Sequence, residues 1–179
     1  MRRQRLVALL LPLLVSASAF AASSYAGQQS REIKALSQEE VVGLLAGKGM
    51  GFAKAAELNG FAGPAHVLEL ASELQLTAEQ RRRTEALFAA MSADAQSWGR
   101  LLVIKEQELD RLFAAKAISP ARLGRALQEI GKLQAEVRQA HLQAHVAQTA
   151  ILTPEQNAKY AVLRGYGPSG EQPEHHHSQ

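Results

Sequence analysis

Residues 77–115 read TAEQRRRTEALFAAMSADAQSWGRLLVIKEQELDRLFAA, and this stretch decides the fold. It opens with Thr77 and Gln80 in the capping-box pattern, in which each side chain bonds to the backbone of the other residue. Apolar residues then recur every three or four positions, as on one face of a helix. They are Leu87, Met91, Trp98, Leu101, Leu102, Leu109, Leu112 and Phe113. The stretch predicts one helix to about Ala115, roughly 55 Å long, with Gly99 as its weak point.

A second long helix follows after a short turn. Ser119 and Pro120 are a cap and a first-turn proline, and the apolar stripe behind them predicts a helix to about Ala150. Its stripe consists of Leu123, Leu127, Ile130, Leu133, Val137, Ala144 and Ile151. Two such helices in sequence predict a long antiparallel hairpin.

Shorter helices are predicted on both sides of this hairpin. A capping box at Ser37 and Glu40 begins one that stops at the glycines of residues 47–51, and Pro64 begins another that covers 65–74. A final helix runs from Thr153 to about Arg164. The fold class is therefore all-α, a long antiparallel helical hairpin with short flanking helices. Because a hairpin this thin cannot bury both apolar stripes, either the short helices or a second copy must cover it, and we expect a homodimer.

The first 21 residues are predicted to be a signal peptide. Arg2, Arg3 and Arg5 precede the apolar run 6–15, and Ala19-Phe20-Ala21 is a cleavage signal. An uncleaved interfacial anchor is the alternative. We divide the rest into a flexible arm (22–36), a helical domain (37–166) and a disordered, histidine-containing tail (167–179). The predicted location is the periplasm, and no later stretch is long enough to span a membrane.

Composition excludes several classes of function. The chain of 179 residues has no cysteine, so disulfides, thiolate metal sites and thiol nucleophiles are excluded. Its net charge of +3 comes from the predicted signal, because without those three arginines 17 basic residues face 17 acidic ones. A nucleic-acid partner is therefore not expected, since binding to phosphates needs a basic surplus. Phosphate-loop, dinucleotide, serine-hydrolase and zinc-protease motifs are also missing, and we predict that the protein is not an enzyme.

One five-residue pattern occurs twice. Residues 76–80 read LTAEQ and residues 152–156 read LTPEQ, so both are L-T-x-x-Q. Taken singly, each is a well-made helix start, in which we expect Thr77 and Thr153 to be caps and Gln80 and Gln156 to close the boxes. We expect Leu76 and Leu152 to be buried where the short helices meet the hairpin.

With its paired LTxxQ motifs, the chain resembles the Spy/CpxP family of periplasmic stress proteins and the related heavy-metal resistance and sensor proteins. The resemblance covers about residues 64–166. It implies a four-helix cradle, usually dimeric, that binds unfolded envelope proteins or senses envelope stress.

Histidines supply candidate metal ligands. His141 and His145 are four residues apart, so they project from one helix face, near the edge of the apolar stripe. His66 flanks the stripe of the earlier short helix, with Glu69 and Glu73 on nearby positions of the same helix. Imidazoles at this spacing with a carboxylate suit Zn²⁺, Ni²⁺, Co²⁺ or Cu²⁺ equally well. The plainer interpretation is a pair of amphipathic residues at a helix seam.

Two functions follow from these patterns. The first is a chaperone-type protein that shields unfolded or aggregation-prone clients without ATP, and the alternative is a periplasmic heavy-metal sensor or buffer. Neither requires a cofactor, although a divalent metal ion would bind in the second. For the tail histidines, residues 175–177, the alternatives are weak metal buffering and incidental low complexity.

Overall fold

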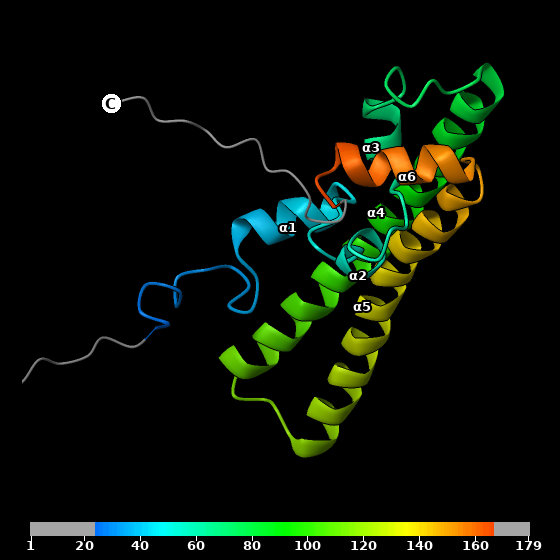
Figure 1. Ribbon diagram of the computed structural model, residues 1–179. Helices are drawn as coiled ribbons and strands as arrows, with labels where there is room; N and C mark the ends of the chain where they lie inside the picture. The colour runs from blue at the N-terminus through cyan, green and yellow to red at the C-terminus, as the bar shows by residue number, and fades with distance from the viewer. Residues whose placement is uncertain (1–23, 167–179) are drawn as a thin grey trace, which may run out of the picture. The chain divides into compact units, whose positions relative to one another are not determined.

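The computed structural model describes residues 24–166, and every regular element within them is a helix. The chain divides after Ser30 into two units, and the fold below concerns residues 31–166. Its helices are α1 (Gln38–Leu45), α2 (Lys54–Glu57), α3 (Pro64–Glu69), α4 (Ala78–Ala114), α5 (Pro120–Thr149) and α6 (Pro154–Leu163). The predicted all-α helical hairpin is confirmed, with α4 and α5 as its two long arms (Figure 1). The predicted signal peptide and tail lie outside the described residues.

Local sequence signals set the ends of the two long helices. Thr77 caps α4 by accepting a hydrogen bond from the Gln80 backbone, and Ser119 caps α5 in front of Pro120. Lys116 takes a positive φ of 51° just beyond α4, which turns the chain toward α5. These ends agree with the sequence prediction to within a residue because capping depends on a few adjacent side chains.

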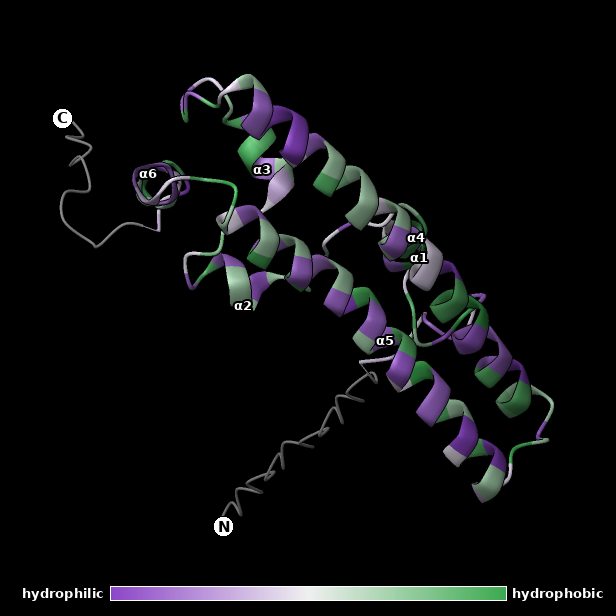
Figure 2. Ribbon diagram, turned by 90° about the vertical axis from the view of Figure 1, so that its right-hand side faces the viewer, coloured by the Kyte–Doolittle hydropathy of each residue, from purple (hydrophilic) through white to green (hydrophobic). Residues whose placement is uncertain are grey.

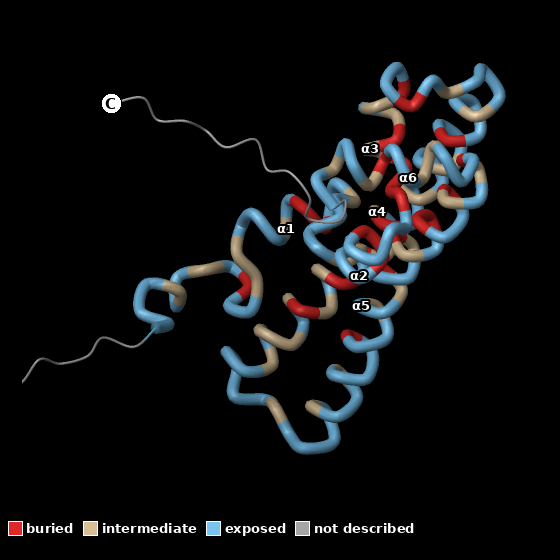
Figure 3. Tube along the Cα trace, in the orientation of Figure 1, coloured by how far each residue is buried: buried red, intermediate tan, exposed pale blue. Residues whose placement is uncertain are grey.

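Burial is concentrated where short helices cover the hairpin (Figure 3). One apolar cluster lies between α1 and the hairpin and contains Leu44, Leu102, Ile130 and Val137. A second lies at the other end of the hairpin, where α3 and α6 pack near the start of α4, and we call it the corner cluster. It contains Ala62, Val67, Leu74, Leu152 and Tyr160. Residues 107–129, at the loop end, include no buried residue. The short helices therefore cover only one part of the hairpin.

The two LTxxQ motifs bond directly to each other. Gln80 Nε2 donates to Gln156 Oε1 at 2.7 Å, and Gln156 Nε2 donates back to Gln80 Oε1 at 3.1 Å. Each oxygen also accepts the backbone N–H of its own cap residue, Thr77 or Thr153. The two predicted capping boxes are thus confirmed, and together they form one reciprocal pair that joins the start of α4 to the start of α6.

The leucines of the motif differ in burial. Leu152 is buried in the corner cluster, as expected, whereas Leu76 is only partly buried beside it. The predicted helix 65–74 is also shorter than expected. It ends at Glu69, and Leu70 caps it with a φ of −97° and a ψ of 19°, so residues 70–75 form turns. Gln75 takes a positive φ of 53° in this stretch.

Residues 31–36 belong to the helical unit, which corrects the predicted arm of 22–36. Ile33 is buried, and the Lys34 Nζ forms an ion pair of 3.1 Å with Asp110 of α4. Gln107 Nε2 also donates to Glu32 at 2.7 Å. The segment has too few apolar residues to show a periodic pattern, so its packing could not be predicted from the sequence.

Gly99 is where α1 crosses α4. A Cβ built at Gly99 would overlap the carbonyl oxygen of Leu44 and lie 2.9 Å from its carbonyl carbon. The glycine that the sequence marked as a weak point of the helix is therefore what permits the close approach of α1.

We predict that Gly99→Ala destabilises the protein even though alanine is the better helix former. Its methyl group meets rigid backbone, and overpacking of this kind costs about 1–3 kcal/mol. Gly131→Ala in α5 is the matched control, because its Cβ would meet nothing within 4 Å. In the control, the free energy of unfolding should rise by up to about 1 kcal/mol. Urea unfolding measures both, and equal stability gains in the two variants would contradict the close approach.

We also predict that Gln80 and Gln156 are energetically coupled. In a double-mutant cycle, Gln80→Ala and Gln156→Ala should be non-additive by about 0.5–3 kcal/mol, because either change removes the same amide pair. Glu40→Ala in the separate box of α1 is the control and should add to Gln80→Ala within about 0.5 kcal/mol. Additivity of the two glutamine variants in urea unfolding would show that the caps act independently.

Candidate functional site

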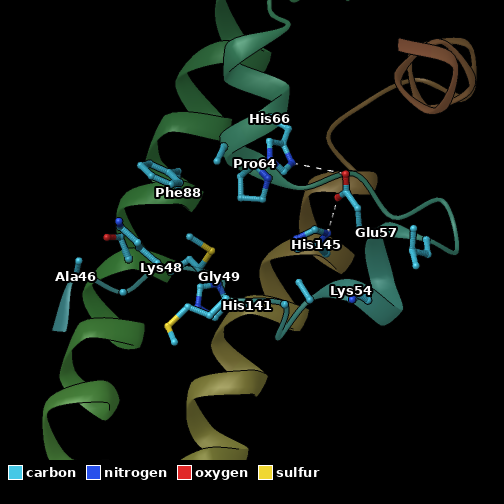
Figure 4. A pocket seen from close by; sticks show the side chains of 18 of the residues that line it. Ala46, Lys48, Gly49, Lys54, Glu57, Pro64, His66, Phe88, His141 and His145 are labelled. Carbon is cyan, nitrogen blue, oxygen red and sulfur yellow. Dashed lines mark ion pairs between the residues drawn. The ribbon is translucent and has the colours of Figure 1, made fainter. Parts of the chain in front are cut away.

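A cavity of about 580 Å³ lies between α4, α5 and the chain from residue 46 to residue 66. Apolar side chains such as Phe88 and Pro64 form much of its wall (Figure 4). Its ionisable side chains come from three different regions of the chain. They are Lys48, Lys54, Glu57, His66, His141, His145 and Tyr166. All three histidines predicted as ligands therefore line one cavity.

Glu57, in α2, is the carboxylate of the cavity, and it lies beside His66 and His145. Its Oε1 accepts hydrogen bonds from Tyr160 Oη at 2.7 Å and from Arg164 Nε at 3.2 Å. Its Oε2 is buried and has no hydrogen-bond partner. The nearest cationic or imidazole group to Oε2 is His145 Nδ1, at 3.6 Å. One oxygen of Glu57 thus accepts hydrogen bonds from two side chains of the α6 region, and the other has no hydrogen-bond partner.

His145 is held in one tautomer by the backbone. Its Nδ1 lies 2.9 Å from the carbonyl oxygen of Phe61, which can only accept, so Nδ1 carries the proton. The ring lies close against Gly63, where a Cβ would be 2.9 Å from Nε2. Nε2 is the ring nitrogen that the Phe61 contact leaves unused, and imidazole binds metal ions through such a nitrogen once it is unprotonated.

His141 is buried, with 3% of its surface exposed. Its ring stacks on Phe52, with ring centroids 6.1 Å apart and planes inclined by 10°. Burial and, to a smaller extent, the neighbouring His145 lower the pKa of His141, so its ring is neutral at pH 7. Its Nε2 has no hydrogen-bond partner. This is an unsatisfied buried nitrogen on the wall of the cavity.

His66 completes the group from the side of α3. Its Nδ1 lies 3.6 Å from Glu57 Oε1 and 3.5 Å from Tyr160 Oη. It is more exposed than the other two histidines, so it lies toward solvent. Burial is the main cause that raises the pKa of Tyr160, and the hydrogen bond to Glu57 raises it further. The hydroxyl of Tyr160 therefore stays protonated and donates to the carboxylate.

The carboxylates predicted as ligands lie elsewhere. Glu69 and Glu73 are exposed and do not line the cavity. The prediction assumed one continuous helix over 65–74, which would place Glu73 two turns from His66 on the same face. Because α3 ends at Glu69, that relation is lost, and Glu57 takes the position beside the histidines.

Sequence reasoning missed Glu57, Tyr160 and Arg164. Glu57 lies in a helix of four residues, too short for a periodic signal, and the two α6 residues are about 100 positions away from it. In the part of the chain that the structure describes, no three histidine, cysteine, aspartate or glutamate side chains form a ready-made metal cluster. The imidazole and carboxylate donors share a cavity without being assembled around one point.

Fold and site together define an all-helical hairpin protein whose cavity carries imidazole and carboxylate groups. The chain belongs to the heavy-metal resistance family, whose model (Metal_resist) matches residues 41–159, more than half of the chain. This family is related to the Spy/CpxP-like periplasmic proteins, and its members are typically periplasmic. No curated protein and no solved structure matches the chain significantly. Among residues 24–166, no helix combines the length and apolarity needed to cross a bilayer.

Proposed function

We propose that this protein binds a heavy-metal ion in the cavity around Glu57 and acts as a periplasmic metal sensor or buffer. The proposed route to the periplasm is the signal peptide predicted at residues 1–21. The role is one of binding, without a catalytic step or a nucleic-acid partner. Membership of the heavy-metal resistance family supports it.

The observation that carries this proposal is a pair of unsatisfied atoms. Glu57 Oε2 and His141 Nε2 are both buried without a hydrogen-bond partner, and both residues line the same cavity. Leaving one such group unsatisfied costs about 1–3 kcal/mol, and more where it is charged. A bound cation would satisfy both, and imidazole with carboxylate suits Zn²⁺, Ni²⁺, Co²⁺ or Cu²⁺. His145, and His66 nearer the solvent, would supply the further donors.

Metal binding at Glu57 would change the hydrogen bonds that connect Glu57 to α6. The carboxylate bonds to Tyr160 and Arg164, so a cation placed there competes with the guanidinium of Arg164. Since no three donors are assembled beforehand, binding must draw side chains together. A change at the cavity is thereby coupled to the helix that begins at the second LTxxQ motif, which is what a sensor requires.

We predict micromolar or tighter binding of at least one of these four ions at neutral pH. The background is the purified chain with His175, His176 and His177 all changed to alanine, so that the tail cannot bind. Calorimetric titration should lose the signal in His141→Ala/His145→Ala and weaken about tenfold or more in Glu57→Gln. The exposed carboxylates give the matched controls Glu69→Gln and Glu73→Gln, which should bind as before.

Binding that survives the double histidine substitution would refute this site. Loss in Glu69→Gln or Glu73→Gln, with Glu57→Gln unaffected, would restore the ligand set predicted from the sequence. Thermal unfolding of every variant shows whether the fold is intact.

Client shielding is the second function we propose, and the uncovered end of the hairpin favours it. Residues 107–129 contain no buried residue, and Phe113 and Leu127 there are 53% and 51% exposed. Apolar residues continue along this half of α4 (Figure 2). Exposed apolar surface of this kind marks an interaction site, either for unfolded clients or for a second copy in the proposed homodimer.

We predict that the protein suppresses aggregation of a reduced model client at a several-fold molar excess, followed by light scattering. Phe113→Ser/Leu127→Ser should reduce this protection without lowering the melting temperature, because neither side chain is buried. Val162→Ser, which changes a 66% exposed residue on α6, is the control and should protect fully. Absence of protection by the unmodified chain removes the chaperone role, and a switch from dimer to monomer in the double variant assigns the surface to self-association.

A further inference from the structure

Both internal methionines of the chain line the cavity that contains the histidines. The sequence has three methionines, Met1, Met50 and Met91. Met50 comes from the glycine-rich segment between α1 and α2, and Met91 comes from the middle of α4. Figure 4 shows two sulfur atoms, in yellow, among the side chains of the wall. Thioethers are thus absent from the rest of the chain after Met1 and gathered at one place with His141 and His145.

Met50 is not placed as an ordinary core residue. It is 43% exposed and takes a φ of 43°, in the left-handed region that a residue with a side chain adopts only at a cost. Gly49 and Gly51 stand on either side of it. A Cβ at Gly43 would overlap the Met50 sulfur, so the bare glycine leaves room for the thioether. The chain accepts backbone strain to hold a methionine at the cavity rather than another glycine.

His141 gives the second observation. Only 3% of its surface is exposed, and its Nε2 has no hydrogen-bond partner. It lines the same cavity as the two methionines. The stack on Phe52 holds its ring in place. A buried imidazole nitrogen without a hydrogen-bond partner, in a cavity that two thioethers also line, is a candidate donor set for a metal ion.

The type of donor limits the type of metal. Thioether sulfur is a soft ligand that selects Cu(I), whereas carboxylate and imidazole suit the divalent ions. The chain has no cysteine, so no thiolate competes for a soft ion. Among residues 24–166, the only thioethers are those of Met50 and Met91, and both residues line this cavity.

We propose that the cavity is a soft-metal site, in which Met50, Met91 and His141 bind Cu(I) or its analogue Ag(I). This inference rests on the proposed metal-binding function and names the class of ion it serves. Glu57 is a hard donor and takes no part in it. Substitution of the methionines should therefore separate Cu(I) binding from the binding of divalent ions.

The alternative role of the methionines is to fill space. Methionine is a flexible apolar residue that fills irregular gaps, and leucine replaces it at small cost where that is its only role. Met50→Leu/Met91→Leu keeps the volume and apolarity of both side chains and removes both sulfurs. Phe88→Leu, another apolar change in the wall of the same cavity, is the matched control.

The test is competition for Cu(I) with a colorimetric Cu(I) chelator under reducing conditions, in the full chain with the tail histidines changed to alanine. Loss of a supporting partner alone weakens metal binding about 10- to 100-fold, so loss of both thioethers should weaken Cu(I) binding at least about tenfold. Zn²⁺ affinity by calorimetry should change less than about twofold in the same variant. With Ag(I), the methyl resonances of both Met50 and Met91 should shift in a carbon–proton NMR spectrum.

Unchanged Cu(I) affinity in the double leucine variant, or unshifted methyl resonances, overturns the soft-metal site. If a divalent ion still binds through Glu57 in that case, the proposed function stands and only this inference fails. Failure of the unmodified chain to bind any of these ions refutes both. Phe88→Leu should bind Cu(I) as the unmodified chain does, and an equal loss there would assign the effect to cavity shape.

Discussion

The reciprocal amide pair between Gln80 and Gln156 is the interaction on which the rest of the structure depends. It ties the start of α4 to the start of α6, and each glutamine also donates to a backbone carbonyl of the other corner, Ile151 or Leu74. Because these amides use both donor and acceptor, neither corner can shift without leaving polar groups unsatisfied. The direction of α6 is set here, and with it the position from which Tyr160 and Arg164 reach Glu57.

A second constraint closes the other side of the cavity. At Gly99 the backbone of α4 lies against the backbone of α1, and the chain that leaves α1 then passes over α5. This brings Phe52 onto the ring of His141 and Met50 into the wall. The cavity is thus assembled from segments fixed at two separate points, a polar corner at one end and a glycine crossing near the middle of α4. Two of its donor atoms, Glu57 Oε2 and His141 Nε2, are buried without a hydrogen-bond partner.

Metal binding and the fold converge on Glu57. The same carboxylate that we propose as a metal ligand holds α6 through two hydrogen bonds, so occupation of the cavity and the position of α6 are thermodynamically linked. The soft donors lie apart from this carboxylate in the sequence and come from different elements. In the two proposals, a hard divalent ion would bind through Glu57, whereas a soft monovalent ion would bind through the methionines. The uncovered loop end of the hairpin is a separate surface, available to clients or to a second copy.

The sequence by itself determined the helices, their caps and the face on which His141 and His145 lie, because these depend on residues within a turn or two of one another. It also selected His66, which does line the cavity. Only the tertiary structure decided that Glu57 lines the cavity while Glu69 and Glu73 do not, that Gln80 bonds Gln156, and that Gly99 is a crossing point. Each of these relations joins residues from separate elements, and nothing in the local pattern records which elements meet. Glu69 and Glu73 lie outside the cavity because α3 ends at Glu69, before the predicted end at residue 74, and this changes which side chains share a face.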